Sequence, residues 1–217
     1  QTTNTVGMTF KSDGTAMYVI SGLVPDTVHQ YSLSTAWDVS TASYASKSFD
    51  VSSQDTAPTD IVFKPDGTIM YIVGDTGNDI NQYSLSTAWD VSTASYVQRF
   101  LLSGEASTPR GVQFKSDGTL MYVLSAGSED SIFQYSLSTA WDISTASYDS
   151  VSFSVISQVT NAWGLLLSSD GTKVYVNDSG GDIVYQYSTV AYTQTLDLST
   201  GTYFSFTPSG ATTVSFT

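Results

Sequence analysis

The sequence Gln30-Tyr-Ser-Leu-Ser-Thr-Ala-Trp-Asp-Val-Ser-Thr-Ala-Ser-Tyr44 decides how this chain can fold, because it occurs three times. It returns 52 residues later at Gln82 and again at Gln134, where Ile143 is the only change. A second motif, Asp-Gly-Thr, precedes each occurrence and opens a fourth unit as well. Two motifs in the same phase define an internal repeat, whose architecture has to be settled before any single residue is interpreted.

Each unit predicts four short antiparallel strands. In the first unit these lie over residues 7–10, 16–20, 28–33 and 43–52, and Asp13-Gly14 forms the first tight turn. Glycine adopts the positive φ that such turns need, and aspartate bonds to its own backbone there. No segment of the chain is predicted to be helical.

The last unit departs from this plan. It keeps Gln-Tyr-Ser at Gln186 but lacks Ala-Trp-Asp, and Leu196 and Leu198 are expected in its fourth strand. Residues 202–217 predict an extra hairpin, which turns at Pro208-Ser-Gly.

Repeated four-stranded meanders of about 50 residues are typical of an all-β propeller, in which neighbouring blades cover each other's apolar faces. We therefore predict four blades over about 7–58, 59–109, 110–162 and 163–200, followed by the hairpin over 201–217 as a possible partial fifth. Phe63 and Phe114 are expected between blades, and Trp89 is expected to pack in the link between third and fourth strands. A parallel β-solenoid is the alternative, disfavoured because its coils are usually shorter.

Closure of the ring stays open at this point. Residues 1–6 are too few to add an outer strand to the last blade. Blade 1 could pack on blade 4, the hairpin could fill the gap, or two chains could pair into a larger ring. The chain begins at Gln1 and its last module stops at Thr217, so we expect a piece of a longer protein.

Composition excludes several partners. Seven Lys and Arg against 20 Asp and Glu give a net charge of −13, which opposes binding to nucleic acid or to an anionic membrane. No apolar run approaches the length of a membrane span, so no membrane insertion is expected. The absence of cysteine excludes disulfides and thiolate sites.

Two resemblances add to this interpretation. Phe10-Lys-Ser-Asp-Gly-Thr-Ala-Met-Tyr-Val19 resembles the YVTN/NHL/lactonase-like propeller repeats. The longer repeated module, and residues 196–216, are similar to β modules in structural proteins of marine bacteriophages, tail-fibre or capsid-associated. The first resemblance implies the propeller fold. The second implies a virion location, with other virion proteins or a host-surface glycan or protein as partners.

Catalytic chemistry has few candidates. The only histidine, His29, stands where other units have Asn81, Phe133 and Tyr185, so we interpret it as an ordinary strand side chain. The Asp-Gly-Thr turns share only part of the aspartate box of sialidases and are interpreted as turns. The lactonase-like resemblance implies a divalent ion held by carboxylates in the central channel, for which Ca²⁺ is suited.

Recurring aspartates are the candidates for that ion. They stand just before each third strand, at Asp26, Asp79, Asp130 and Asp182. Capping of the loops is the alternative role. No Asp-x-Asp-x-Asp-Gly ligand run is present, so we predict no cofactor and leave Ca²⁺ open.

One face of the propeller varies between units. The turns between first and second strands and the Ala-Trp-Asp links should share the constant face, whereas the loops between second and third strands and between blades should share the variable one. Arg110 and Trp163 stand on the variable face where other units have Val6 and Thr59, and Asp60 replaces a glycine. We predict that a ligand binds nearest these three residues, with the four recurring aspartates around them; unconstrained drift of the loops is the alternative.

The sequence-based hypothesis is a non-enzymatic structural or receptor-binding module of a phage virion. A Ca²⁺-dependent lactonase-like hydrolase and a carbohydrate-binding propeller are the alternatives.

Overall fold

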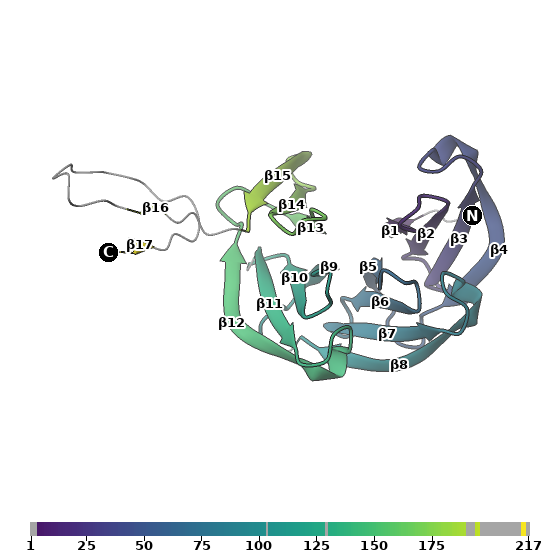
Figure 1. Ribbon diagram of the computed structural model, residues 1–217, viewed down its shortest axis with the longest axis horizontal. Helices are drawn as coiled ribbons and strands as arrows, with labels where there is room; N and C mark the ends of the chain where they lie inside the picture. The colour runs from purple at the N-terminus through teal and green to yellow at the C-terminus, as the bar shows by residue number, and fades with distance from the viewer. Residues whose placement is uncertain (1–3, 103, 129, 190–193, 196–213, 216–217) are drawn as a thin grey trace.

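The computed structural model describes residues 4–102, 104–128, 130–189, 194–195 and 214–215. Three four-stranded antiparallel sheets and one three-stranded sheet follow each other along the chain, each paired in sequence order. Figure 1 shows these four blades side by side along an open arc, with blade 1 at one end and blade 4 at the other. The predicted all-β propeller of four blades is confirmed.

The strands have the following bounds. Blade 1 contains β1 (Thr5–Phe10), β2 (Ala16–Ser21), β3 (Thr27–Leu33) and β4 (Ala42–Asp50). Blade 2 contains β5 (Pro58–Phe63), β6 (Ile69–Gly74), β7 (Asp79–Leu85) and β8 (Ala94–Leu101). Blade 3 contains β9 (Pro109–Phe114), β10 (Leu120–Ser125), β11 (Ser131–Leu137) and β12 (Ala146–Ser154). Blade 4 contains β13 (Ala162–Leu167), β14 (Lys173–Asp178) and β15 (Ile183–Ser188).

The end of the chain is described only in part. β16 (Gln194–Thr195) pairs in parallel with β17 (Val214–Ser215). The fourth strand expected at Leu196 and Leu198, and most of the hairpin predicted over 202–217, lie outside the described residues.

The expectation that nothing is helical is wrong at the links. A 3-10 turn follows each Trp-Asp pair, at η1 (Val39–Thr41), η2 (Val91–Thr93) and η3 (Ile143–Thr145). The aspartate before each turn accepts a hydrogen bond from the backbone N–H two residues on, which is an N-cap contact. Such a turn has no amphipathic periodicity, so the sequence does not reveal it.

The repeated tryptophan packs on the turn of its own blade. Trp37 donates its backbone N–H to the carbonyl oxygen of Gly14 at 3.0 Å, and the next two blades repeat this contact. A Cβ at Gly14, where φ is 73°, would lie 2.5 Å from the Trp37 ring. The two motifs of the repeat are therefore one structural unit, and they lie on the same face of the blade.

Apolar residues between blades form the core. Phe63 of blade 2 lies 4.5 Å from Tyr18 of blade 1 between ring centroids, and Phe114 stands in the same relation to Tyr71. Trp89 packs against Phe63 at 5.3 Å. The predicted inter-blade positions of these aromatics are confirmed.

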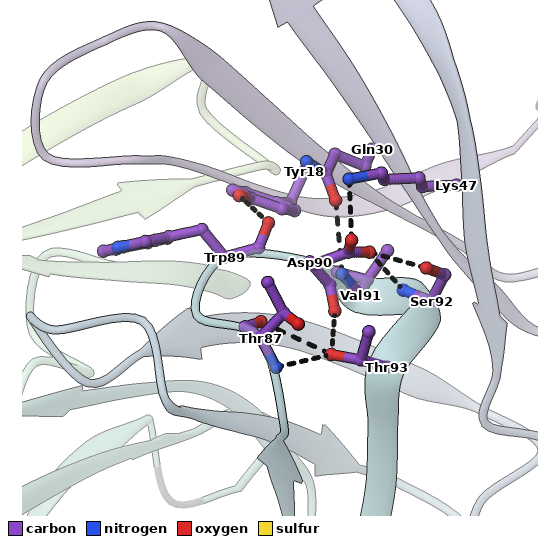
Figure 2. Close-up of polar contacts among 9 residues, drawn as sticks. All are labelled: Tyr18, Gln30, Lys47, Thr87, Trp89, Asp90, Val91, Ser92 and Thr93. Atoms are coloured by element: carbon purple, nitrogen blue, oxygen red, sulfur yellow. Dashed lines mark hydrogen bonds and ion pairs between the residues drawn. The ribbon is translucent and has the colours of Figure 1, made fainter.

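Polar contacts also join blade 1 to the link of blade 2, and blade 2 to the link of blade 3. At the first interface the Tyr18 hydroxyl donates to the Trp89 carbonyl oxygen at 2.7 Å, and Gln30 Oε1 accepts from the Val91 backbone N–H at 3.2 Å. Lys47 Nζ binds Asp90 Oδ2 at 2.7 Å (Figure 2). We call these residues the link clamp. Tyr71, Gln82 and Gln98 form the same clamp on Trp141, Ile143 and Asp142 of blade 3.

Candidate functional site

The inner strands carry the candidate site. β1, β5, β9 and β13 lie side by side in this order along the inside of the arc (Figure 1). Backbone hydrogen bonds join each inter-blade segment to the loop after the second strand of its blade, such as Asp75 N to the Ala57 carbonyl oxygen at 3.0 Å. The variable loops therefore share one face, as predicted, and the sequence differences gather at one end of the inner strands.

Arg110 joins three blades on this face. Its Nη1 binds Asp75 Oδ2 of blade 2 at 3.0 Å, and its guanidinium carbon lies 4.9 Å from the ring centroid of Trp163 in blade 4. Arginine over a tryptophan face gains electrostatic attraction from the ring quadrupole. The structure therefore brings together two of the predicted site residues, Arg110 and Trp163, and adds Asp75. Asp75 is in a variable loop, but nothing in its local sequence marks it as the partner of Arg110.

Asp60 occupies a position that is glycine in the other three blades. In the register of the sheets it matches Gly7, Gly111 and Gly164. The inner strands approach so closely here that a Cβ on Gly7 would lie 3.0 Å from the Asp60 Cα. Blade 2 accommodates an aspartate because Gly111 of the next blade leaves room beside it.

The Asp60 carboxylate is held by backbone groups of two blades. Oδ2 accepts from the Val112 N–H at 3.1 Å, and Oδ1 accepts from the Ile61 N–H at 2.8 Å. Burial raises the pKa of Asp60 to about 7, while these two donors act to lower it. The group can therefore exchange a proton near neutral pH. On β9 the Asp60 carboxylate lies beside Gly111 and Val112, and Arg110 precedes these two residues in the strand.

The four recurring aspartates do not gather into a site. Asp26, Asp79 and Asp130 are buried, whereas Asp182 is exposed. Asp79 is not the structural equivalent of the others. Asn78, one residue earlier, adopts the positive φ that Asp130 and Asp182 show, so Asn78 holds their position in blade 2. The carbonyl oxygens of Asp26 and Asp130 accept from Val51 and Val155, so this position serves the inter-blade loops. Their part in binding stays a prediction.

Asp26 is an unusual buried charge. Neither of its carboxylate oxygens has a hydrogen-bond partner, and burial raises its pKa. The equivalent Asp130 accepts from the backbone N–H of Ala162 at 3.4 Å. The residue matching Ala162 in blade 2 is Pro58, which has no N–H to donate.

Asp55 and Asp79 form an acidic pair in blade 2. Asp55 accepts from the backbone N–H groups of Ala57 and Gly77 at 2.6 and 2.9 Å. Its charge contributes to the raised pKa of Asp79, for which burial is the main cause. The sequence could have suggested Asp55, since no other unit has an acid at this position.

No metal centre emerges from these acids. Within the described part of the chain, no three His, Cys, Asp or Glu side chains are grouped so that they could hold one ion. Ca²⁺ takes six to eight oxygen ligands, and these acids alone do not supply them; the expectation about the cofactor stays a prediction. Likewise, the part of the chain with assigned structure contains no helix that is long and apolar enough to cross a membrane.

Comparisons with known proteins support the fold. None of the protein-family models matches the sequence, and neither does any curated protein. Among solved structures, a candidate 6-phosphogluconolactonase of Bacteroides uniformis matches 85% of the chain at 12% identity with a TM-score of 0.59. The periplasmic gluconolactonase PpgL of Pseudomonas aeruginosa matches 83% at 15% identity with a TM-score of 0.55. The β-propeller domain of Cps50 (Swd1) from Myceliophteria thermophila matches 86% at 9% identity with a TM-score of 0.53.

The class of protein that these matches define is the β-propeller, with lactonases among its relatives in fold. The chain covers 50%, 48% and 54% of the three matched structures, so it spans about half of their length. The three structures described above are named as two lactonases and a propeller domain, and none of these three names is that of a phage protein. The hypothesis of a non-enzymatic virion module is therefore wrong on these comparisons, which favour the lactonase-like alternative.

Proposed function

We propose that this chain forms part of a lactonase-like hydrolase that opens a sugar lactone at the inner-strand end of the variable face. The observation that carries the proposal is Asp60, a carboxylate whose pKa of about 7 suits a general base near neutral pH. One matched structure is named as a candidate 6-phosphogluconolactonase and another as a gluconolactonase, which suggests the substrate class.

The proposed reaction is simple hydrolysis. Ionised Asp60 accepts a proton from water as the water oxygen bonds to the lactone carbonyl carbon. The ring C–O bond then breaks, and the proton passes from Asp60 to the departing ring oxygen, which gives the open hydroxy acid. Arg110 would stabilise the negative charge that develops on the substrate.

Trp163 supports the choice of a sugar. Its side chain is 36% exposed, and Arg110 contacts the ring. An exposed indole offers a flat apolar surface for the face of a sugar ring. The same observation favours a second candidate, a carbohydrate-binding propeller that holds a sugar without turnover.

The test is hydrolysis of gluconolactone and 6-phosphogluconolactone. Its rate is measured as proton release in excess of the spontaneous rate. We expect Asp60→Asn to lower kcat by about 100-fold or more, because general-base catalysis contributes on that scale. We expect kcat to rise with pH through about 7 in the wild type, since only ionised Asp60 accepts the proton. Asp50→Asn, at an exposed carboxylate on the outer strand β4, is the matched control.

Two results would decide against hydrolysis. A wild-type rate equal to the spontaneous rate, or an Asp60→Asn variant as active as the wild type, overturns the proposal. Binding of sugars on a glycan array that is lost in Trp163→Ala, without turnover, would establish the carbohydrate-binding candidate instead.

A further inference from the structure

The two ends of the arc carry complementary halves of the link clamp. Inside the chain, each clamp joins the second, third and fourth strands of one blade to the link of the next. Blade 1 also has a link of its own, Trp37-Asp-Val39, which no earlier blade of this chain covers. The side chain of Val39 is 60% exposed, whereas Val91 and Ile143 at the same position are fully buried.

Other residues on this end of blade 1 are exposed in the same way. Trp37 is 59% exposed, although its equivalents Trp89 and Trp141 are packed against the blade before them. Met8 of β1 is 58% exposed, whereas Ile61 and Val112 at the matching position are fully buried. This surface is therefore an inter-blade face without its neighbour.

Blade 4 presents the opposite half of the clamp. Tyr175 of β14 pairs with Gln186 of β15 in the same register as Tyr18 with Gln30 and Tyr71 with Gln82. Gln186 is exposed, although Gln30 and Gln82 are buried against the following link. Val184 is 65% exposed at the position where Val28 and Ile80 are fully buried.

Blade 3 shows that the clamp changes where no link follows. Blade 4 lacks a Trp-Asp link in its sequence, and Gln134 of blade 3 instead donates to Asp149 of its own blade at 2.9 Å. Val151 stands where Lys47 and Gln98 bind the link aspartate. Blade 4 has the tyrosine and the glutamine in the same register as blades 1 and 2, and blade 3 also has them, as Tyr122 and Gln134.

We propose that the exposed link of blade 1 binds blade 4 of a second copy of this chain, so that two chains close one ring head to tail. The Tyr175 hydroxyl would donate to the Trp37 carbonyl oxygen of the second copy, and Gln186 would accept from its Val39 N–H. The interface continues the geometry of the interfaces inside the chain. Because the chain spans about half of the propellers it matches, two copies supply the length of one.

A head-to-tail contact places different surfaces of the two chains together. Such an interface closes into a ring when the rotation per copy allows it, and otherwise grows into an open filament. Figure 1 shows blades 1 and 4 at the two ends of an open arc. We expect closure after two copies, because one chain covers about half of the matched propellers.

The test is the molar mass in solution by light scattering across micromolar concentrations. We expect twice the 23.2 kDa of one chain. Val39→Asp and Val184→Asp each place a charge in both interfaces of the ring, so each variant alone should be a monomer. Both side chains are exposed in the single chain, so folding should be unaffected, which circular dichroism checks. Val97→Asp, on the outer strand β8 and also exposed, should remain a dimer.

Mixing the two variants makes the test specific for this geometry. The mixture retains one unaltered interface, between blade 4 of the Val39→Asp chain and blade 1 of the Val184→Asp chain. We expect a heterodimer from the mixture although neither variant associates alone. A wild-type monomer, a filament, a dimer broken by only one of the two variants, or a mixture that stays monomeric overturns the proposal. The readout does not depend on the proposed lactonase activity.

Discussion

The hydroxyl of Tyr18 in blade 1 donates a 2.7 Å hydrogen bond to the carbonyl oxygen of Trp89 in blade 2, 71 residues later. Tyr71 and Trp141 repeat this contact between blades 2 and 3. The repeat therefore encodes an interface as well as a blade, because one unit carries both the donor for the next unit and the acceptor for the previous one.

Removal of this hydroxyl should weaken the interface modestly. We expect Tyr18→Phe to lower the free energy of unfolding by about 1 kcal/mol, as for a typical hydrogen bond whose acceptor is left without a partner. Urea denaturation measures the change. Tyr96→Phe, at an exposed tyrosine of blade 2, is the control and should change stability little. Equal effects of the two substitutions would mean that the contact with Trp89 contributes nothing.

Position in the arc should decide how much a repeated phenylalanine contributes. Phe63 packs against Tyr18 of the blade before it and against Trp89, so Phe63→Ala should cost about 3 kcal/mol, at the lower end of the range for Phe→Ala. Phe10 holds the same position in blade 1 but has no earlier blade to contact. Phe10→Ala should therefore cost clearly less in the single chain. Comparable losses in denaturant titrations would contradict this account of the inter-blade layer.

Asp60 should make stability depend on pH between about 4 and 7. Its pKa is raised in the folded chain, so the folded state holds a proton there that the unfolded state has lost. The stability contributed by Asp60 is therefore present at low pH and is lost as pH rises through about 7. The free energy of unfolding changes by no more than about 4 kcal/mol through this group. Thermal melts measure this change. From pH 4 to 7 the melting temperature of the wild type should fall relative to that of Asp60→Asn, and above pH 7 the difference between the two should stay constant. A difference in melting temperature that is the same at every pH would contradict the raised pKa.

Asp26 offers a stabilising substitution at neutral pH. Burial raises its pKa, and the charges of Asp55 and Asp50 add to that rise, so the ionised form destabilises the folded state. Blade 2 has Asn78 at this position. We expect Asp26→Asn to raise the melting temperature at pH 8 and to have a smaller effect at pH 4, because protonation of the wild-type carboxyl removes the buried charge as the pH falls. Asp182→Asn at the exposed equivalent should change neither value. A gain at pH 4 as large as at pH 8 would point to packing in place of charge.

The repeat, the strands and the turns could be predicted from the sequence because they depend on short stretches of chain. Asp13 accepts from the N–H and hydroxyl of Thr15 at 3.0 and 2.6 Å, and glycine follows it at positive φ. All these residues lie within three positions, so the composition of the turn is enough to predict it. Phe and Tyr at matching positions of successive units likewise predicted the inter-blade layers. The sequence also indicated the variable face, through comparison of one unit with the next.

Only the tertiary structure decided what that face contains. Asp75, Arg110 and Trp163 come from three blades, and their contacts depend on how closely the inner strands approach, which no local pattern records. The raised pKa of Asp60 depends on burial against blade 3 for the same reason. The recurring aspartates show the converse, because equal spacing in sequence did not bring them together. Repetition fixes the structure of each blade through local turns and pairing, whereas desolvation and contact between blades are non-local and require the assembled arc.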